Sequence, residues 1–152
     1  NVAGRYGWEH RSIMSITINH QTNVISATNG SLTIDGASEV MSTITGATAV
    51  VAHDISLAYV FYHSGMSTNF IANFTNVPTT NDRATSIALL LTQGAAAYLP
   101  TAVQIGGSAQ TINWANNTLP SGTPNNVDAV SFTLIRTGSS WTVVGSLSTF
   151  GV

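Results

Sequence analysis

The sequence contains no cysteine and no lysine, and charged residues make up only 7% of its 152 residues. The absence of cysteine excludes disulfides, thiolate metal ligands and cysteine nucleophiles. The net charge is −2, and the only Lys or Arg side chains are four scattered arginines. Because a nucleic-acid partner requires a basic face that displaces counterions from phosphates, we expect no nucleic-acid binding. The polar surface must consist of Ser, Thr, Asn and Gln, which suits a rigid particle component or a stable extracellular module.

Long apolar runs are also missing from the sequence. No stretch approaches the roughly 18 apolar residues of a membrane span, so we expect no membrane insertion. The first residue is Asn1 rather than Met, and no signal pattern follows it, so we expect a processed chain or a piece of a longer one. A domain of this size can bury a core of its own, so we expect it to fold without a cofactor or metal.

Residues 1–47 predict an extended N-terminal arm that is rich in short β segments. Ile16 and Ile18 alternate with small polar residues, as do Leu32 and Ile34. Strands this short, with such small side chains, bury little apolar surface and need another layer or another chain. This region therefore gives a first indication of an oligomer. Two dipeptides in it favour tight hairpin turns: Asn29-Gly30 and Asp35-Gly36.

Residues 48–152 predict a β-sandwich. Apolar residues alternate with other residues over 55–62 and 70–74, and they form a continuous run over 87–91 that is typical of a central strand. Further short strands are predicted near Val103, near Ile112, and in a closing hairpin over 127–150. Strands at intervals of about 8–12 residues with turn signals between them favour an antiparallel β-sandwich or jelly roll. No stretch has a convincing helical pattern.

The sequence offers only weak candidates for catalytic residues. His53 and Asp54 are adjacent, so on a strand their side chains would point to opposite faces and could not cooperate. Ser64 follows His63 but lacks the Gly-x-Ser-x-Gly elbow of serine hydrolases. We therefore predict that the protein is not an enzyme.

The sequence offers equally weak candidates for metal ligands and for the carboxylate pair of a glycosidase. The four histidines include no His-x-His pair that a threefold axis would collect into a metal site. The six acidic residues do not cluster as the paired carboxylates of glycoside hydrolases do, although an intersubunit pair such as Asp35 and Glu39 stays open. We predict no metal.

Several short motifs occur in an order that resembles a known family. An aromatic strand ends in Asn76-Val77-Pro78, an apolar strand ends in Leu91-Thr92-Gln93-Gly94, and Ile112-Asn113-Trp114 follows. After the loop Ser121-Gly122-Thr123-Pro124 comes Val127-Asp128-Ala129-Val130-Ser131-Phe132, then a Gly-Ser turn and a strand with Trp141. This order, over about residues 50–151, resembles the C-terminal β-sandwich modules of tailed-bacteriophage virion proteins, chiefly tail fibres.

The resemblance implies a structural protein of the virion: a tail fibre or related appendage that is homotrimeric and contacts other virion proteins. It also implies possible contact with a host-surface glycan or protein. A capsid decoration or head-fibre protein is an alternative. A secreted jelly-roll carbohydrate-binding module is another, since Trp114 and Trp141 could stack on sugars, although core packing is the plainer interpretation of both.

Receptor contacts are expected in loops, because loops carry binding functions on rigid scaffolds. The best candidate is the polar loop over 116–126, followed by the turns over 64–69 and 79–83. The predicted contact residues are Asn116, Asn117, Ser121, Asn125, Asn126, Ser64, Asn69, Asp82 and Arg83.

Overall fold

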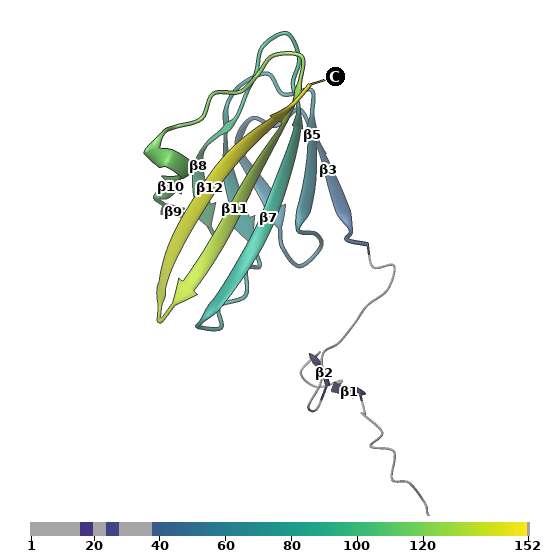
Figure 1. Ribbon diagram of the computed structural model, residues 1–152, viewed down its shortest axis with the longest axis vertical. Helices are drawn as coiled ribbons and strands as arrows, with labels where there is room; N and C mark the ends of the chain where they lie inside the picture. The colour runs from purple at the N-terminus through teal and green to yellow at the C-terminus, as the bar shows by residue number, and fades with distance from the viewer. Residues whose placement is uncertain (1–15, 20–23, 28–37, 152) are drawn as a thin grey trace, which may run out of the picture. The chain divides into compact units, whose positions relative to one another are not determined.

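The computed structural model describes residues 16–19, 24–27 and 38–151 (Figure 1). The chain divides into two compact units, one ending at Ser38 and one beginning at Glu39. In the first unit, β1 (Ile16–Asn19) pairs antiparallel with β2 (Val24–Ala27), so a strand lies where Ile16 and Ile18 predict one. The terminal residues 1–11, the predicted strand at Leu32 and Ile34, and both predicted hairpin turns lie outside the described residues.

The second unit is an all-β sandwich, which confirms the predicted fold class. Its six-stranded sheet has the order β10-β12-β11-β7-β5-β3, and its four-stranded sheet has the order β4-β6-β8-β9. The six-stranded sheet contains β3 (Met41–Thr45), β5 (Val60–Ser64), β7 (Arg83–Thr92), β10 (Ile112–Trp114), β11 (Val127–Thr137) and β12 (Ser140–Phe150). The four-stranded sheet contains β4 (Ala49–Asp54), β6 (Phe70–Thr75), β8 (Pro100–Ile105) and β9 (Ser108–Gln110).

The chain crosses from one sheet to the other after each strand from β3 to β7. As a result, β3, β5 and β7 pair parallel in one sheet, and β4, β6 and β8 pair parallel in the other. Three coils are stacked in this way: β3–β4, β5–β6 and β7–β8. The sandwich is therefore of mixed pairing rather than antiparallel throughout, because a strand that returns after a full coil runs in its original direction.

The strand predicted over residues 55–62 is in fact a turn followed by the beginning of β5. The alternating pattern over 55–62 predicts a single strand, but residues 55–59 form a turn between β4 and β5. The amides of Leu57 and Ala58 both donate to the carbonyl of Asp54, which closes this turn. Ile55 and Ala58 are nevertheless buried. Some of the apolar residues in this pattern are therefore turn residues whose side chains pack in the core, and not residues of a strand.

The C-terminal hairpin supplies the antiparallel part of the six-stranded sheet. β11 and β12 are eleven residues each and pair along their whole length, from Val127 opposite Phe150 to Thr137 opposite Ser140. Gly138 has φ +58°, which the first position of a two-residue hairpin turn requires. On its other edge β11 pairs antiparallel with β7. The hairpin therefore lies between β7 and the edge strand β10, which pairs parallel with β12.

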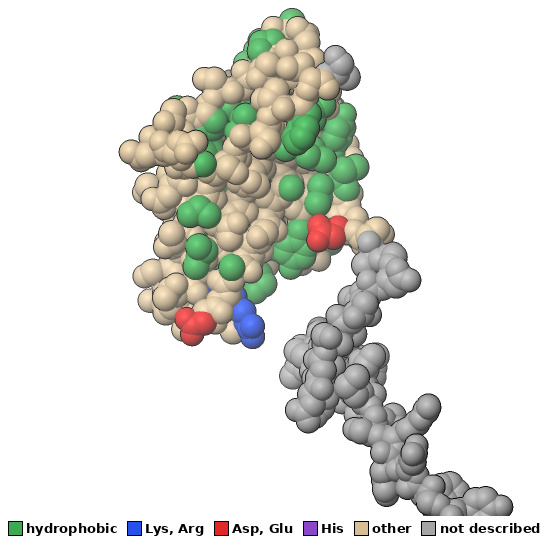
Figure 2. Space-filling model, in the orientation of Figure 1, with side chains coloured by type: hydrophobic (Ala, Val, Ile, Leu, Met, Phe, Trp, Pro, Cys, Tyr) green, Lys and Arg blue, Asp and Glu red, His purple; other side chains and the backbone are tan. Residues whose placement is uncertain are grey.

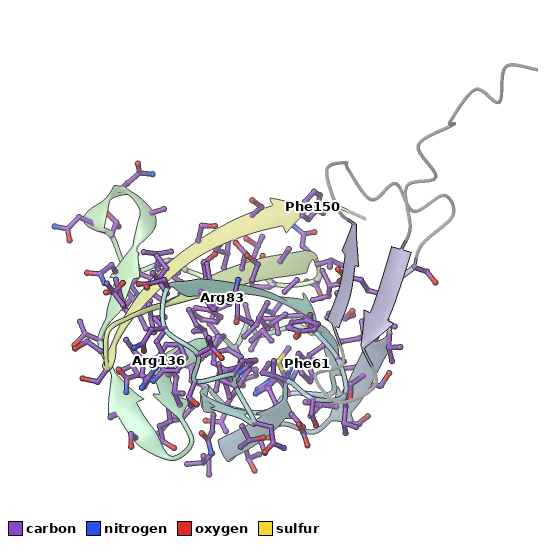
Figure 3. The ribbon with its side chains drawn as sticks, turned by 90° about the horizontal axis from the view of Figure 1, so that it is seen from below. Phe61, Arg83, Arg136 and Phe150 are labelled. Atoms are coloured by element: carbon purple, nitrogen blue, oxygen red, sulfur yellow. The ribbon has the colours of Figure 1, made fainter. Side chains whose placement is uncertain are left out.

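The core lies between the two sheets and is aromatic at its centre. Phe61, Phe70, Phe74 and Phe132 are all buried, and Figure 3 shows Phe61 pointing into the space between the sheets. Over residues 87–92 of the central strand β7, one face is buried and the other is half-buried. Two rings from opposite sheets, Phe74 and Phe132, meet edge to face with centroids 5.6 Å apart, a favoured aromatic geometry.

Candidate functional site

The loop between β10 and β11 has a hollow on each of its two sides. It begins with the 3-10 turn η1 (Ala115–Asn117) and continues through Leu119, Pro120 and Gly122. Pro120 lines both hollows, so they adjoin each other across the loop. We define residues 115–122 as the rim loop.

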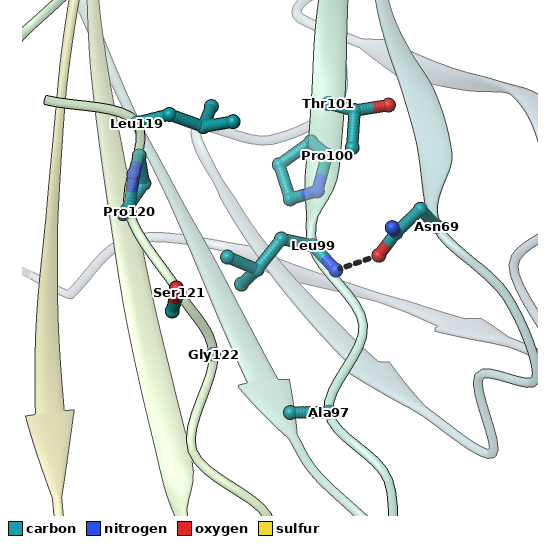
Figure 4. Close-up of a pocket in the computed structure, with 9 residues that line it drawn as sticks. All are labelled: Asn69, Ala97, Leu99, Pro100, Thr101, Leu119, Pro120, Ser121 and Gly122. Atoms are coloured by element: carbon teal, nitrogen blue, oxygen red, sulfur yellow. Dashed lines mark hydrogen bonds between the residues drawn. The ribbon is translucent and has the colours of Figure 1, made fainter.

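The first hollow has a volume of about 310 Å³ and lies between the rim loop and the start of β8 (Figure 4). Leu99 and Pro100 form one wall, and Leu119 and Pro120 face them from the rim loop. The Asn69 carboxamide oxygen accepts a 2.9 Å hydrogen bond from the Leu99 amide, which fixes this wall. Asn69, Thr101 and Ser121 add polar groups to the lining.

The second hollow has a volume of about 320 Å³ and is lined in part by Trp114. The Trp114 ring packs on Phe132 with centroids 5.6 Å apart. On β12, a Cβ placed at Gly145 would lie 2.9 Å from Trp114 Cζ3, so the absence of a side chain there allows the ring to approach the strand. Trp114 is half-buried, and it combines core packing with a place in the lining of the hollow.

The buried carboxylate of Asp128 fixes the segment that follows the rim loop, at Thr123. Asp128, fully buried at the start of β11, accepts hydrogen bonds from the Gln93 side-chain amide and the Thr123 backbone amide, both 2.9 Å, and from the Thr149 hydroxyl at 2.7 Å. Gln93 also binds the backbone of Tyr98 through both ends of its carboxamide. This network ties the segment leading to β8 to the segment leading to β11. We call it the Asp128 network.

Gly122 completes the junction between these segments. A Cβ at Gly122 would lie 2.9 Å from Ala97 Cβ, 3.1 Å from Asp128 Oδ2 and 3.3 Å from Leu99 Cγ. Only a residue without a side chain fits here unless its neighbours move. The Gly122 backbone therefore packs directly against the wall of the first hollow.

The chemistry of the two hollows suits recognition of a neutral ligand. Every residue that lines them is uncharged and non-ionisable, and apolar walls alternate with amide and hydroxyl groups. Binding sites of this kind use apolar surface for affinity and a few polar groups for orientation. The hollows therefore offer binding groups but no acid–base pair.

The structure gathers part of the predicted contact set around the rim loop. Asn69 and Ser121 line the first hollow, and Asn116 lines the second. Asn117 is exposed on the rim loop itself. Asn125 and Asn126 lie beyond it: the Asn125 amide donates to the Gly94 carbonyl, and the Asn126 carbonyl accepts from Gln93.

The remaining predicted residues lie elsewhere. Ser64 ends β5, and its carbonyl accepts a hydrogen bond from the Gly46 amide. Asp82 and Arg83 stand at the beginning of β7, where Arg83 is opposite Arg136 in the pairing with β11. The rim loop lies near the other end of β7, so these two residues are not part of the site. Figure 3 shows Arg83 and Arg136 on these strands.

Several lining residues are not apparent from the sequence. Leu99, Pro100 and Leu119 look like ordinary apolar positions, and the walls that they form depend on how the loops pack. Leu119 is the one lining residue that the sequence could have indicated, because an isolated leucine in a polar loop is far from other apolar residues. The structure leaves it 64% exposed, as expected of an apolar side chain that packs in no core.

The paired residues His53 and Asp54 have separate environments, as their adjacency predicts. His53 is buried between the sheets, whereas the Asp54 carboxylate lies at the surface and accepts hydrogen bonds from Ser56 and Asn76. Those hydrogen bonds, first from the Ser56 hydroxyl and then from the Asn76 side chain, lower the pKa of Asp54. They make Asp54 part of the turn after β4.

Among the described residues, no helix is long and apolar enough to cross a membrane, and no group of three or more His, Cys, Asp or Glu side chains is arranged to hold a metal ion. No protein-family model matches the chain, and neither a curated protein nor a solved structure matches it.

Proposed function

We propose that this chain is a structural protein of a tailed-phage virion, belonging to a tail fibre or related appendage. In this proposal it acts as a homotrimer, assembles with other virion proteins, and contacts a host-surface glycan or protein through the rim loop. The observation that carries the adhesive part is the pair of uncharged hollows on the two sides of the rim loop. A preorganised site on a rigid scaffold reduces the entropic cost of binding.

Self-association is supported by exposed apolar side chains near β3. Val40, Leu57 and Tyr59 line one surface hollow next to Glu39, and they are 69%, 67% and 42% exposed. Figure 2 shows hydrophobic side chains gathered on the side of the sandwich where β3 and β5 lie. Contiguous apolar surface of this kind marks protein interfaces. A neighbouring copy of the chain is the occupant that the trimer proposal requires.

One rival function has an observation in its favour. A tryptophan in the lining of a hollow, as Trp114 is here, could stack on a sugar ring in a carbohydrate-binding module, and such a module would act as a monomer. Light scattering separates the two functions. The fibre proposal expects a mass three times the 15.9 kDa of one chain, and a stable monomer would favour the module instead.

Two matched leucine variants separate adhesion from assembly. Leu119 and Leu57 are almost equally exposed, at 64% and 67%. Leu119 lies in the rim loop, whereas Leu57 lies on the apolar surface near β3. We expect Leu119→Asp to weaken attachment to host cells without changing the mass in solution. We expect Leu57→Asp to lower the mass while leaving monovalent binding of an isolated receptor glycan or protein unchanged.

The location on the particle needs a separate measurement. Electron microscopy of virions labelled with an antibody against this chain is expected to place the label on the tail. Label on the head would replace the appendage proposal with a capsid decoration or head-fibre protein. Virions without label would contradict the virion assignment altogether.

A further inference from the structure

Two buried histidines connect the two sheets through the aromatic centre of the core. His53 comes from β4 in the four-stranded sheet, and His63 comes from β5 in the six-stranded sheet. Both are 0% exposed, and their Nε2 atoms lie 2.9 Å apart. An imidazole pair is an unusual way to fill a core, since a buried polar group is tolerated only when it is hydrogen-bonded.

The hydrogen bonds assign one neutral arrangement to the pair. His53 Nδ1 lies 3.0 Å from the Val51 carbonyl oxygen, which can only accept, so Nδ1 carries the proton of His53. His53 Nε2 is then an acceptor, and His63 Nε2 must donate to it. This leaves His63 Nδ1 unprotonated, and it is a buried atom with no hydrogen-bond partner among the described residues.

Aromatic side chains pack against the pair. Phe61 from β5 and Phe70 and Phe74 from β6 contact the imidazoles, with ring centroids 4.9–6.3 Å apart.

The ionisable side chains of the neighbouring strands bind other groups. Asp54 and Tyr62 are on the opposite faces of their strands, away from the pair. Asp128 is buried on the core face, but it lies two strands away from His63, opposite Leu91, and its carboxylate accepts the hydrogen bonds of the Asp128 network. In the described part of the chain, the pair makes no hydrogen bond to a carboxylate that would balance a positive charge.

Protonation of either ring is therefore unfavourable in the folded core. Burial, together with the charge of His63, lowers the pKa of His53 to about 3, and burial lowers the pKa of His63 to about 4. A histidine in an unfolded or opened segment titrates near 6.5. An opened state consequently binds more protons than the closed state between about pH 6.5 and pH 4.

The pair joins the first coil of the stack, through His53 on β4, to the second coil, through His63 on β5. β3 pairs only with β5, and β4 pairs only with β6, among the strands that the structure describes. The first coil, β3–β4, can thus separate without breaking the pairing of β7 with β11 or of β11 with β12. End elements of stacked structures open at lower free energy than central ones.

We propose that the His53–His63 pair is an acid-sensitive latch that holds the first coil closed at neutral pH and releases it when the imidazoles take up protons. At neutral pH the hydrogen bond between the rings joins the two sheets. In acid, a protonated imidazole requires water or a counter-charge, and the aromatic cage supplies neither. Opening of β3–β4 exposes His53 and His63 to solvent while the C-terminal hairpin stays formed.

Hydrogen exchange with mass spectrometry tests this on the full chain between pH 7.5 and pH 4.5, with exchange times scaled to the intrinsic rate at each pH. We expect the protection of residues 41–54, which form the first coil, to fall about tenfold per pH unit for each proton taken up on opening. The protection of residues 127–150 should stay constant. A flat profile over 41–54, or an equal loss in both segments, would overturn the latch.

Two double variants remove the titration while keeping side-chain volume. His53→Gln with His63→Gln keeps amide groups that can hydrogen-bond, and His53→Leu with His63→Leu replaces the pair by apolar packing. Either folded variant is expected to show no pH-dependent loss of protection over 41–54. Acid opening that persists in them as in the wild-type chain would assign the effect to another group.

Discussion

At the scale of single residues, the asparagines of the predicted contact set have a second role. Asn116, Asn117 and Asn125 have φ values of 56°, 53° and 58°, in the left-handed region. Asparagine tolerates this conformation better than most residues with a side chain. Their presence in the loop is thus explained by backbone geometry, whether or not a receptor touches them. An Asn-rich loop is a weak predictor of binding for this reason.

Substitutions at Asn125 separate the two roles. Asn125→Ala should lower the free energy of unfolding by about 1 kcal/mol, because alanine is strained at positive φ, whereas Asn125→Gly should be nearly neutral. Urea unfolding of both variants measures this. If the side chain also contacts a receptor, the glycine variant will bind less while remaining equally stable. Equal destabilisation by glycine and alanine would contradict the backbone explanation.

Gly145 is a residue whose lack of a side chain positions Trp114. We expect Gly145→Ala to lower the free energy of unfolding by about 1–3 kcal/mol, because the new Cβ would lie 2.9 Å from the indole ring and 3.1 Å from Ile112 Cγ2. Tryptophan fluorescence should report a more exposed Trp114. Gly94→Ala is the control, since a Cβ at Gly94 has open space around it, and a comparable loss there would refute the steric argument.

At the scale of elements, the Asp128 network determines how two loops meet. Its carboxylate oxygens receive all three hydrogen bonds from uncharged donors, so an amide at this position would place an NH₂ group against at least one donor. The pairing of β11 with β12 fixes Asp128 opposite Thr149, and the loops then close over it.

We expect Asp128→Asn to lower the free energy of unfolding by about 1–3 kcal/mol and to speed hydrogen exchange in residues 119–126. Ser131→Ala is the matched control on the same strand, because it removes a single exposed hydrogen bond, 2.8 Å from Ser146. The control should lose less than about 1 kcal/mol and leave exchange over 119–126 unchanged. A larger loss in the control would mean that the network is not what stabilises the loop.

Elements were predictable from sequence where the pattern is local. The alternation over 70–74, the apolar run over 87–91 and the closing hairpin correspond to β6, β7 and β11–β12. Gly106 and Gly107, with φ values of +57° and +83°, form the turn between β8 and β9. In each case the signal is carried by a few neighbouring residues.

Pairing between distant strands was less predictable. Nothing local in Val60 or Ala88 reveals that they are partners in a parallel pair, and the two-residue periodicity is the same for parallel and antiparallel strands. The walls of the first hollow share this problem, since Leu99 and Leu119 come together only when two loops pack. The polar loop over 116–126 lines both hollows, but the walls at Leu99 and Pro100 do not follow from the sequence.

At the scale of the whole molecule, stability should depend on pH in one direction. The histidine pKa values of about 3 and about 4 lie below the unfolded value near 6.5, so stability is full above pH 6.5 and falls as the pH drops toward 4. Two protons give a slope of at most about 2.7 kcal/mol per pH unit. Urea unfolding at pH 7, 6 and 5 measures it, and a midpoint that does not decrease between pH 7 and pH 5 would contradict the prediction.

The place of β11 in the sheet also determines when folding can finish during synthesis. β11 lies between β7 and β12, although many residues separate it from β7 in the chain. As the chain leaves the ribosome, the three coils appear first, and the free edge of β7 carries unpaired amides and carbonyls until β11 follows. Such an edge can pair with another chain. The interval between the emergence of β7 and the emergence of β11 from the ribosome is therefore the time at which nascent chains are most exposed to pairing with one another, and a chaperone that covers β7 would act then.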